Sequence, residues 1–139
     1  LYLPSLYSEE LPPIVIGIDT SGSIDGRILS QFAAEVTAIL EDFRTTAHII
    51  YCDSEVQGVE DFTPEDPVIL HPKGGGGTDF RPVFRHVEEE GLTPSCLIYL
   101  TDMDGEFPAE EPPYPVLWCK TRDRIPAPFG EEVLLSAEG

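Results

Sequence analysis

The sequence predicts an α/β domain built on a mostly parallel sheet with helices on both faces. Residues 14–19 and 47–52 are short, β-branched apolar runs of the kind that form buried strands. Residues 26–43 between them carry apolar side chains at helical spacing. Strands that alternate with helices in this way are typical of parallel sheets whose two faces are both covered.

The remaining elements follow the same alternation along the chain. Residues 55–62 and 68–70 are expected to form a hairpin-like pair, or one strand followed by an irregular loop. Residues 80–90 predict a helix with Pro82 in its first turn and Gly91 at its end. Further strands are expected at residues 95–101, 116–120 and 133–136.

Length and composition predict one folded domain. The chain has 139 residues, of which 41% are hydrophobic, and a chain of this length buries roughly two-thirds of its unfolded surface. Residues 1–13 are expected to form an extended lead-in, and residues 14–139 the domain itself. Residues 105–115 are acidic and proline-rich, too short and broken for a complete crossover helix.

Charge narrows the classes of partner. The net charge is −18, from 26 acidic and 8 basic residues, which disfavours binding to nucleic acid and to anionic membranes. No apolar run is long enough to cross a membrane. The three cysteines, Cys52, Cys96 and Cys119, lie in strand-like runs and are expected to be buried free thiols. A reducing, cytoplasmic location is therefore expected.

An oxygen-rich segment follows the first predicted strand. Asp19, Ser21 and Ser23 alternate along residues 19–23, so their oxygens can converge where the chain turns. Convergent hard oxygens with one formal charge suit Mg²⁺ or Mn²⁺, which keep open positions for water and an outside ligand. The alternative is an ordinary strand-to-helix connection in which Ser23 or Asp25 caps the next helix.

Two other loops carry the same chemistry. Residues 74–80 form a glycine-rich loop that contains Thr78 and Asp79 before a predicted helix. Residues 101–105 follow another predicted buried strand and contain Asp102. Because loops at the carboxyl ends of neighbouring parallel strands meet in one crevice, all three segments are expected to share a site.

These segments resemble the metal-ion-dependent adhesion site of the von Willebrand factor A domain. The family pattern is Asp-x-Ser-x-Ser, then a threonine from a middle loop, then an aspartate from a Thr-Asp-Gly loop. In this sequence Asp19, Ser21, Ser23, Thr78 and Asp102 fill those positions in order. The resemblance implies that Ser21, Ser23 and Thr78 bind Mg²⁺ or Mn²⁺ directly, while the aspartates often act through bound water.

The third motif departs from the family pattern. It is expanded here to Thr-Asp-Met-Asp-Gly, which makes Asp104 a rival to Asp102. Asp102 is preferred because it directly follows the predicted strand, as the family's acidic residue does. The resemblance covers residues 11–135 and implies a three-layer, Rossmann-like sheet.

A bacterial subgroup of this family is especially similar, with an A-like domain placed C-terminal to a predicted metallopeptidase region. The similar segments are residues 3–7, 51–53, 76–80 and 115–118. This chain contains no His-Glu-x-x-His, so no peptidase activity of that type is expected in it. The family resemblance implies a protein partner that completes the metal with an acidic side chain, and an AAA-type ATPase is one such partner.

Two alternatives stay open. The segment Leu100-Thr101-Asp102-Met103-Asp104-Gly105 also resembles the haloacid-dehalogenase phosphatase motif, with Asp102 as nucleophile, Asp104 as acid/base and Mg²⁺ between enzyme and substrate. That family expects threonine or valine where this chain has Glu106. The other alternative is a structural domain with no bound metal.

The histidines do not indicate a site. A Ser-His-Asp hydrolase would need a histidine beside Ser21 or Ser23. His48 falls in a predicted strand and His86 in a predicted helix, so structural roles are expected for both. No Cys and His pair is spaced closely enough in sequence to indicate zinc.

Overall fold

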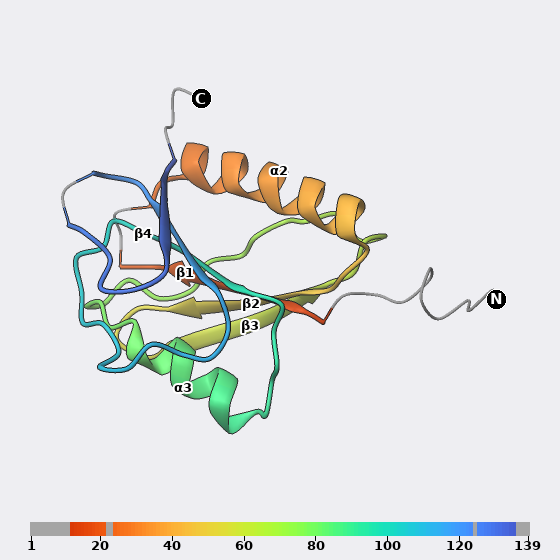
Figure 1. The fold of residues 1–139 in the computed structure, drawn as a ribbon. Helices are drawn as coiled ribbons and strands as arrows, with labels where there is room; N and C mark the ends of the chain where they lie inside the picture. The colour runs from red at the N-terminus through yellow and green to blue at the C-terminus, as the bar shows by residue number, and fades with distance from the viewer. Residues whose placement is uncertain (1–11, 22–23, 124, 136–139) are drawn as a thin grey trace.

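The computed structural model describes residues 12–21, 24–123 and 125–135, which form a six-stranded sheet with helices on both faces (Figure 1). The strand order is β3-β2-β1-β4-β5-β6, and all neighbouring pairs are parallel except β2 and β3. This arrangement confirms the predicted fold class. The strands are β1 (Ile14–Asp19), β2 (Ala47–Cys52), β3 (Val56–Phe62), β4 (Leu97–Thr101), β5 (Val116–Lys120) and β6 (Glu131–Leu134).

Two helices cover opposite faces of the sheet (Figure 1). They are α2 (Gly26–Phe43) and α3 (Arg81–Glu89), and each packs on its own apolar cluster. Alternate residues of β1 serve the two clusters, since Ile16 lies with the side chains of α2 and Val15 with those of α3. All six residues of β1 are buried, which explains its continuous apolar run.

Local sequence sets both ends of α2. Asp25 Oδ1 accepts a hydrogen bond of 2.9 Å from the Ile28 amide, so Asp25 is the N-cap. The helix ends at Arg44, which adopts a left-handed conformation with φ of 48° and donates its amide to the Leu40 carbonyl. The apolar stripe is buried as its spacing predicts, through Ile28, Phe32, Val36 and Leu40.

Residues 68–70 form no strand, so of the two alternatives for residues 55–70 the structure confirms a single strand, β3, followed by an irregular segment. Two strand boundaries differ from the predictions. The strand expected at 95–101 begins two residues later, at Leu97. The last strand, expected at 133–136, begins two residues earlier at Glu131. Gly130 explains the shift, because its φ of 75° suits glycine and a Cβ there would lie 2.6 Å from the Val116 carbonyl oxygen. Because the two backbones approach closely at Gly130, pairing with β5 begins at the next residue, Glu131.

The other expectations for regular structure are met. Pro82 lies in the first turn of α3, and Gly91 follows that helix with φ of 65°. Residues 105–115 contain no helix or strand. Cys52 and Cys119 are buried free thiols, whereas Cys96 is only half-buried because it precedes β4. No helix in the described part of the chain is long and apolar enough to span a membrane.

Candidate metal site at the carboxyl edge of the sheet

Four connecting segments meet where the parallel strands end. They follow β1, β2 and β4, and the fourth is the glycine-rich loop before α3. The Thr20 amide donates to the Cys52 carbonyl at 3.0 Å, which joins the segments after β1 and β2. The Phe80 amide donates to the Glu106 carbonyl at 2.9 Å, which joins the loop before α3 to the segment after β4. The topology therefore brings the predicted oxygen-rich segments to one edge.

Asp19 is the buried centre of this edge. Its Oδ1 accepts hydrogen bonds from the Ser21 amide at 2.9 Å and the Ser21 hydroxyl at 2.5 Å. Its Oδ2 accepts from the Thr101 hydroxyl at 2.7 Å. Thr101 Oγ1 in turn accepts from the Met103 amide at 3.0 Å. Asp19 is fully buried, so these donors fix the orientation of its carboxylate and satisfy it in place of water.

The inserted Met103 explains how the expanded third motif fits. Its side chain is fully buried in the α3 cluster, and its φ is 74°, an unusual conformation for a bulky residue. Asp102 before it is 8% exposed and accepts the Asp104 amide at 3.0 Å, whereas Asp104 is exposed. The turn therefore holds Asp102 directly at the end of β4 and leaves Asp104 in solvent.

Thr78 lies against the segment that follows β4. A Cβ built on Gly105 would lie 2.7 Å from Thr78 Cγ2 and 3.0 Å from the Phe80 ring. No larger residue fits at Gly105 unless this loop moves. The absence of a side chain at Gly105 thus lets the Thr78 loop approach the segment that carries Asp102.

Asp53 anchors the glycine-rich loop. Its carboxylate accepts hydrogen bonds from Gln57 Nε2 at 3.0 Å, the Glu55 amide at 3.1 Å and the Gly76 amide at 3.0 Å. These donors, the Gln57 side chain foremost, lower the pKa of Asp53 to about 2. The bond from the Gly76 amide ties the end of β2 to the loop that carries Thr78.

A cavity of about 260 Å³ opens beside Asp19. It is lined partly by Thr20, Lys73 and Gly74. Thr20 Oγ1 is buried and has no hydrogen-bond partner among the described residues, and it lies 2.3 Å from the position a Cβ on Gly74 would take. A buried hydroxyl without such a partner suits a cavity that receives water.

Four of the five predicted ligands lie in the segments that meet here. Asp19 and Ser21 contact each other, Asp102 follows the threonine that binds Asp19, and Thr78 packs against Gly105. Ser23 lies outside the described residues. Among the described residues, no group of three or more His, Cys, Asp or Glu side chains is placed to hold a metal. The predicted set does not depend on such a group, because hydroxyls supply three of its five members.

Sequence reasoning missed Thr101 as part of the site. Thr101 is the last residue of β4 and is fully buried, and its hydroxyl connects Asp19 to the turn at Met103. A threonine at the end of an apolar strand is a weak signal by itself. Thr101 comes close to Asp19 because β4 pairs with β1, with Leu100 opposite Ile18. That pairing is known only once the order of the strands in the sheet is known.

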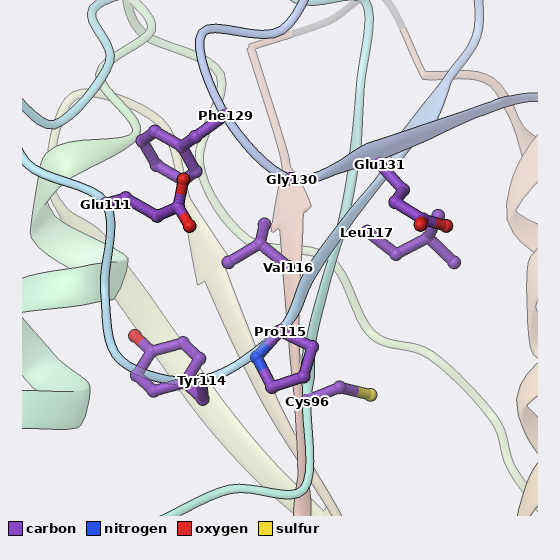
Figure 2. Close-up of a pocket in the computed structure, with 9 residues that line it drawn as sticks. All are labelled: Cys96, Glu111, Tyr114, Pro115, Val116, Leu117, Phe129, Gly130 and Glu131. Carbon is purple, nitrogen blue, oxygen red and sulfur yellow. The ribbon is translucent and has the colours of Figure 1, made fainter.

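A second cavity lies at the opposite, amino edge of the sheet (Figure 2). Its volume is also about 260 Å³, and it is lined mainly by apolar groups that include Tyr114, Val116 and Phe129. Figure 2 shows Glu111 and Glu131 on different segments around this cavity. Among the described residues its lining holds no hydroxyl–carboxylate network like the one around Asp19, so the edge at Asp19 is the better candidate for a cation site.

The sheet order, the opposed helices and the oxygen-bearing loops define a von Willebrand factor A-like α/β domain. The chain belongs to the family described as VWA-like domain (DUF2201), whose model matches residues 14–136.

Two individual proteins extend this comparison. An uncharacterized protein of Thermotoga maritima is 31% identical over 107 residues, which cover 77% of this chain and 27% of that protein. The chain therefore spans about a quarter of that relative. The crystal structure of the ArnB paralog VWA2 from Sulfolobus acidocaldarius matches with a TM-score of 0.61 and 13% identity, over 80% of this chain and 35% of that one. At this identity the likeness shows the fold alone.

Proposed function

We propose that this domain is a protein-binding module that uses one divalent cation, Mg²⁺ or Mn²⁺, at the carboxyl edge of its sheet. The observation that carries the proposal is the buried Asp19 carboxylate, which is held by the Ser21 and Thr101 hydroxyls and lines a cavity. The Thr20 hydroxyl in the lining of that cavity has no partner among the described residues. Oxygen donors of this kind suit a small hard cation.

In this proposal Ser21, Ser23 and Thr78 hold the cation through neutral hydroxyls, while Asp19 and Asp102 act mainly through water. Such a ligand set leaves most of the cation's positive charge unneutralised. The bound cation supplies a Lewis-acidic position that a partner's carboxylate can occupy. Asp19 keeps Ser21 oriented through the 2.5 Å hydroxyl bond, and the Gly76 to Asp53 bond holds the Thr78 loop close.

The partner in this proposal is a protein that presents an acidic side chain. By analogy with intracellular A domains, we propose an AAA-type ATPase as the partner and a cytoplasmic location. The chain spans only 27% of its Thermotoga maritima relative, so we propose that the whole protein carries further regions. By the family resemblance, we propose that one of them is the predicted metallopeptidase region. No catalytic role is proposed for this domain itself.

Calorimetric titration with Mg²⁺ and Mn²⁺ tests the proposal. Wild-type protein should give a saturable one-site signal, and Ser21→Ala should abolish it while leaving the circular dichroism unchanged. Ser54→Ala is the matched control, because Ser54 is exposed in the segment after β2 and should leave binding intact. A wild-type chain that binds neither cation, with or without acetate as a stand-in for the partner's carboxylate, would contradict the proposal.

Asp102→Asn separates binding from catalysis. The variant should weaken cation binding, and neither it nor the wild type should hydrolyse a generic phosphomonoester in Mg²⁺. Turnover by the wild type that is lost in Asp102→Asn would instead establish the phosphatase alternative.

A further inference from the structure

Two histidines far apart in sequence face each other on the α3 side of the sheet. His48 lies in β2 and His86 in α3, and their Nε2 atoms are 3.3 Å apart. The ring centroids are 5.5 Å apart and the ring planes differ by 16°. Since the centroids are separated by far more than the nitrogens, the two rings point their Nε2 atoms toward each other.

A carboxylate fixes the orientation of one ring. Asp61 in β3 lies directly across from His48, and its Oδ1 is 2.5 Å from His48 Nδ1. A carboxylate can only accept a hydrogen bond, so the neutral His48 ring carries its proton on Nδ1 and its lone pair on Nε2, the atom that faces His86. Carboxylate–histidine pairs of this kind orient the histidines that bind metals in many proteins.

We infer that His48 and His86 form a binding site for a late first-row divalent cation such as Zn²⁺, Ni²⁺ or Cu²⁺, with Asp61 as the positioning residue. Imidazole nitrogens suit these cations. Two nitrogens about 2.0–2.1 Å from a tetrahedral metal would be about 3.3–3.4 Å apart. The observed Nε2 separation of 3.3 Å matches that spacing, and a rotation of the rings would aim both lone pairs at the cation. Water would fill the other positions.

Without the cation, a neutral His86 can donate its Nε2 proton to His48. Binding requires His86 to carry that proton on Nδ1 instead, which is a change of tautomer with no net loss of a proton. The His48 side chain is 18% exposed, so the pair is accessible from solvent. The net charge of −18 attracts cations at long range.

This site is independent of the proposed oxygen site. His48 is the second residue of β2, near the amino edge, whereas Asp19 ends β1 at the carboxyl edge. The two sites also prefer different cations, because hydroxyl and carboxylate oxygens suit Mg²⁺ and imidazole suits Zn²⁺. Failure of either proposal would leave the other standing.

Zn²⁺ calorimetry in excess Mg²⁺ tests the inference on the whole chain. The wild type should bind one equivalent, and His48→Gln and His86→Gln should each weaken binding at least tenfold. Asp61→Asn should weaken it about tenfold or more through loss of ring orientation. His71→Gln is the matched control, because His71 Nδ1 also pairs with a carboxylate, Glu60 Oε2 at 3.0 Å. It should bind Zn²⁺ as the wild type does.

Electron paramagnetic resonance with Cu²⁺ gives a second readout. The wild type should show hyperfine splitting from two imidazole nitrogens, and His86→Gln should show one. Ser21→Ala should keep the Zn²⁺ and Cu²⁺ signals even where Mg²⁺ binding is lost. Absence of Zn²⁺ binding in the wild type would overturn the inference. An affinity unchanged in both His48→Gln and His86→Gln, or an equal loss in His71→Gln, would overturn it as well.

Discussion

The neighbouring strands β4 and β5 end side by side but carry opposite chemistry. At the end of β4, the Thr101 hydroxyl donates to the buried Asp19 carboxylate. At the end of β5, Lys120 Nζ lies 2.7 Å from Glu132 Oε1 and 3.3 Å from Asp123 Oδ1. The Lys120 side chain is only 4% exposed, and its ammonium group forms ion pairs with both carboxylates.

This difference supports placing the proposed cation at the β1 and β4 half of the carboxyl edge and not at β5. Around β5 the positive charge is already supplied by Lys120, and the pKa of Glu132 is lowered mainly by its hydrogen bond from that ammonium. Around β1 and β4 the donors are neutral hydroxyls and amides, which orient Asp19 without neutralising it. Asp19 therefore keeps its negative charge close to the Ser21 hydroxyl, which the proposal assigns to the cation.

Of the substitutions that test this difference between β4 and β5, replacing the threonine at the end of β4 should have the largest effect on stability. Thr101→Val removes a donor from Asp19 and an acceptor from the Met103 amide, and both groups are buried. Leaving them unpaired should lower the free energy of unfolding by about 3 kcal/mol. Thr121→Val is the control after β5, because Thr121 Oγ1 is buried with no partner among the described residues. In urea denaturation, the free energy of unfolding of Thr121→Val should be within about 0.5 kcal/mol of the wild-type value, or higher. Equal losses of stability in Thr101→Val and Thr121→Val would contradict the assigned role of Thr101.

Adding a methyl group at Gly105, where two loops touch, should have an intermediate effect on stability. In Gly105→Ala the new methyl group would press on Thr78 Cγ2 and the Phe80 ring. We expect a loss of about 2 kcal/mol from overpacking, and weaker Mg²⁺ binding because Thr78 moves. Gly77→Ala is the control on the loop that carries Thr78, since a Cβ at Gly77 meets nothing within 4 Å. Denaturation and calorimetry on both variants check this, and unchanged Mg²⁺ binding in Gly105→Ala would argue against a role for Thr78.

Acid should loosen the glycine-rich loop through Asp53. Its folded pKa of about 2 lies below the ordinary 3.8, so this carboxylate stabilises the folded chain above about pH 4. The contribution is lost as the pH falls toward 2, and it should be on the order of 1 kcal/mol once solvent screening is allowed for. Asp53→Asn should remove that pH dependence. Unfolding curves between pH 5 and pH 2 should converge for the two proteins at the acid end; parallel curves would contradict the assignment.

The strands and helices with strong periodicity were predictable from the sequence. β1, α2, β2 and β5 begin and end where their apolar patterns do, since burial on both sheet faces or on one helical stripe dictates those patterns. β6 was placed two residues late because all four of its residues are exposed. A strand that is held by backbone pairing to β5, and by the close approach at Gly130, leaves little pattern in its side chains.

The candidate site was predictable as a set of segments but not as a network. Asp19 and Ser21 stand two residues apart, so their contact could be inferred from local spacing. The bonds from Thr101 to Asp19 and from Gly76 to Asp53 join residues 82 and 23 positions apart. Contacts of that range depend on the order of strands in the sheet, which a single sequence does not specify. The pairing of His48 with His86 was missed for the same reason.

The two outermost strands have a consequence for aggregation. β3 and β6 each have one neighbour in the sheet, so one side of each offers backbone groups that another chain could pair with. Each carries two consecutive acidic residues, Glu60 with Asp61 and Glu131 with Glu132. Because successive residues point to opposite faces of a strand, each outer strand bears a carboxylate on both sides of the sheet. On β6 Glu132 is already paired with Lys120, so the carboxylate of Glu131 is the one that opposes pairing with another acidic outer strand next to Val133 and Leu134, which are both about half exposed.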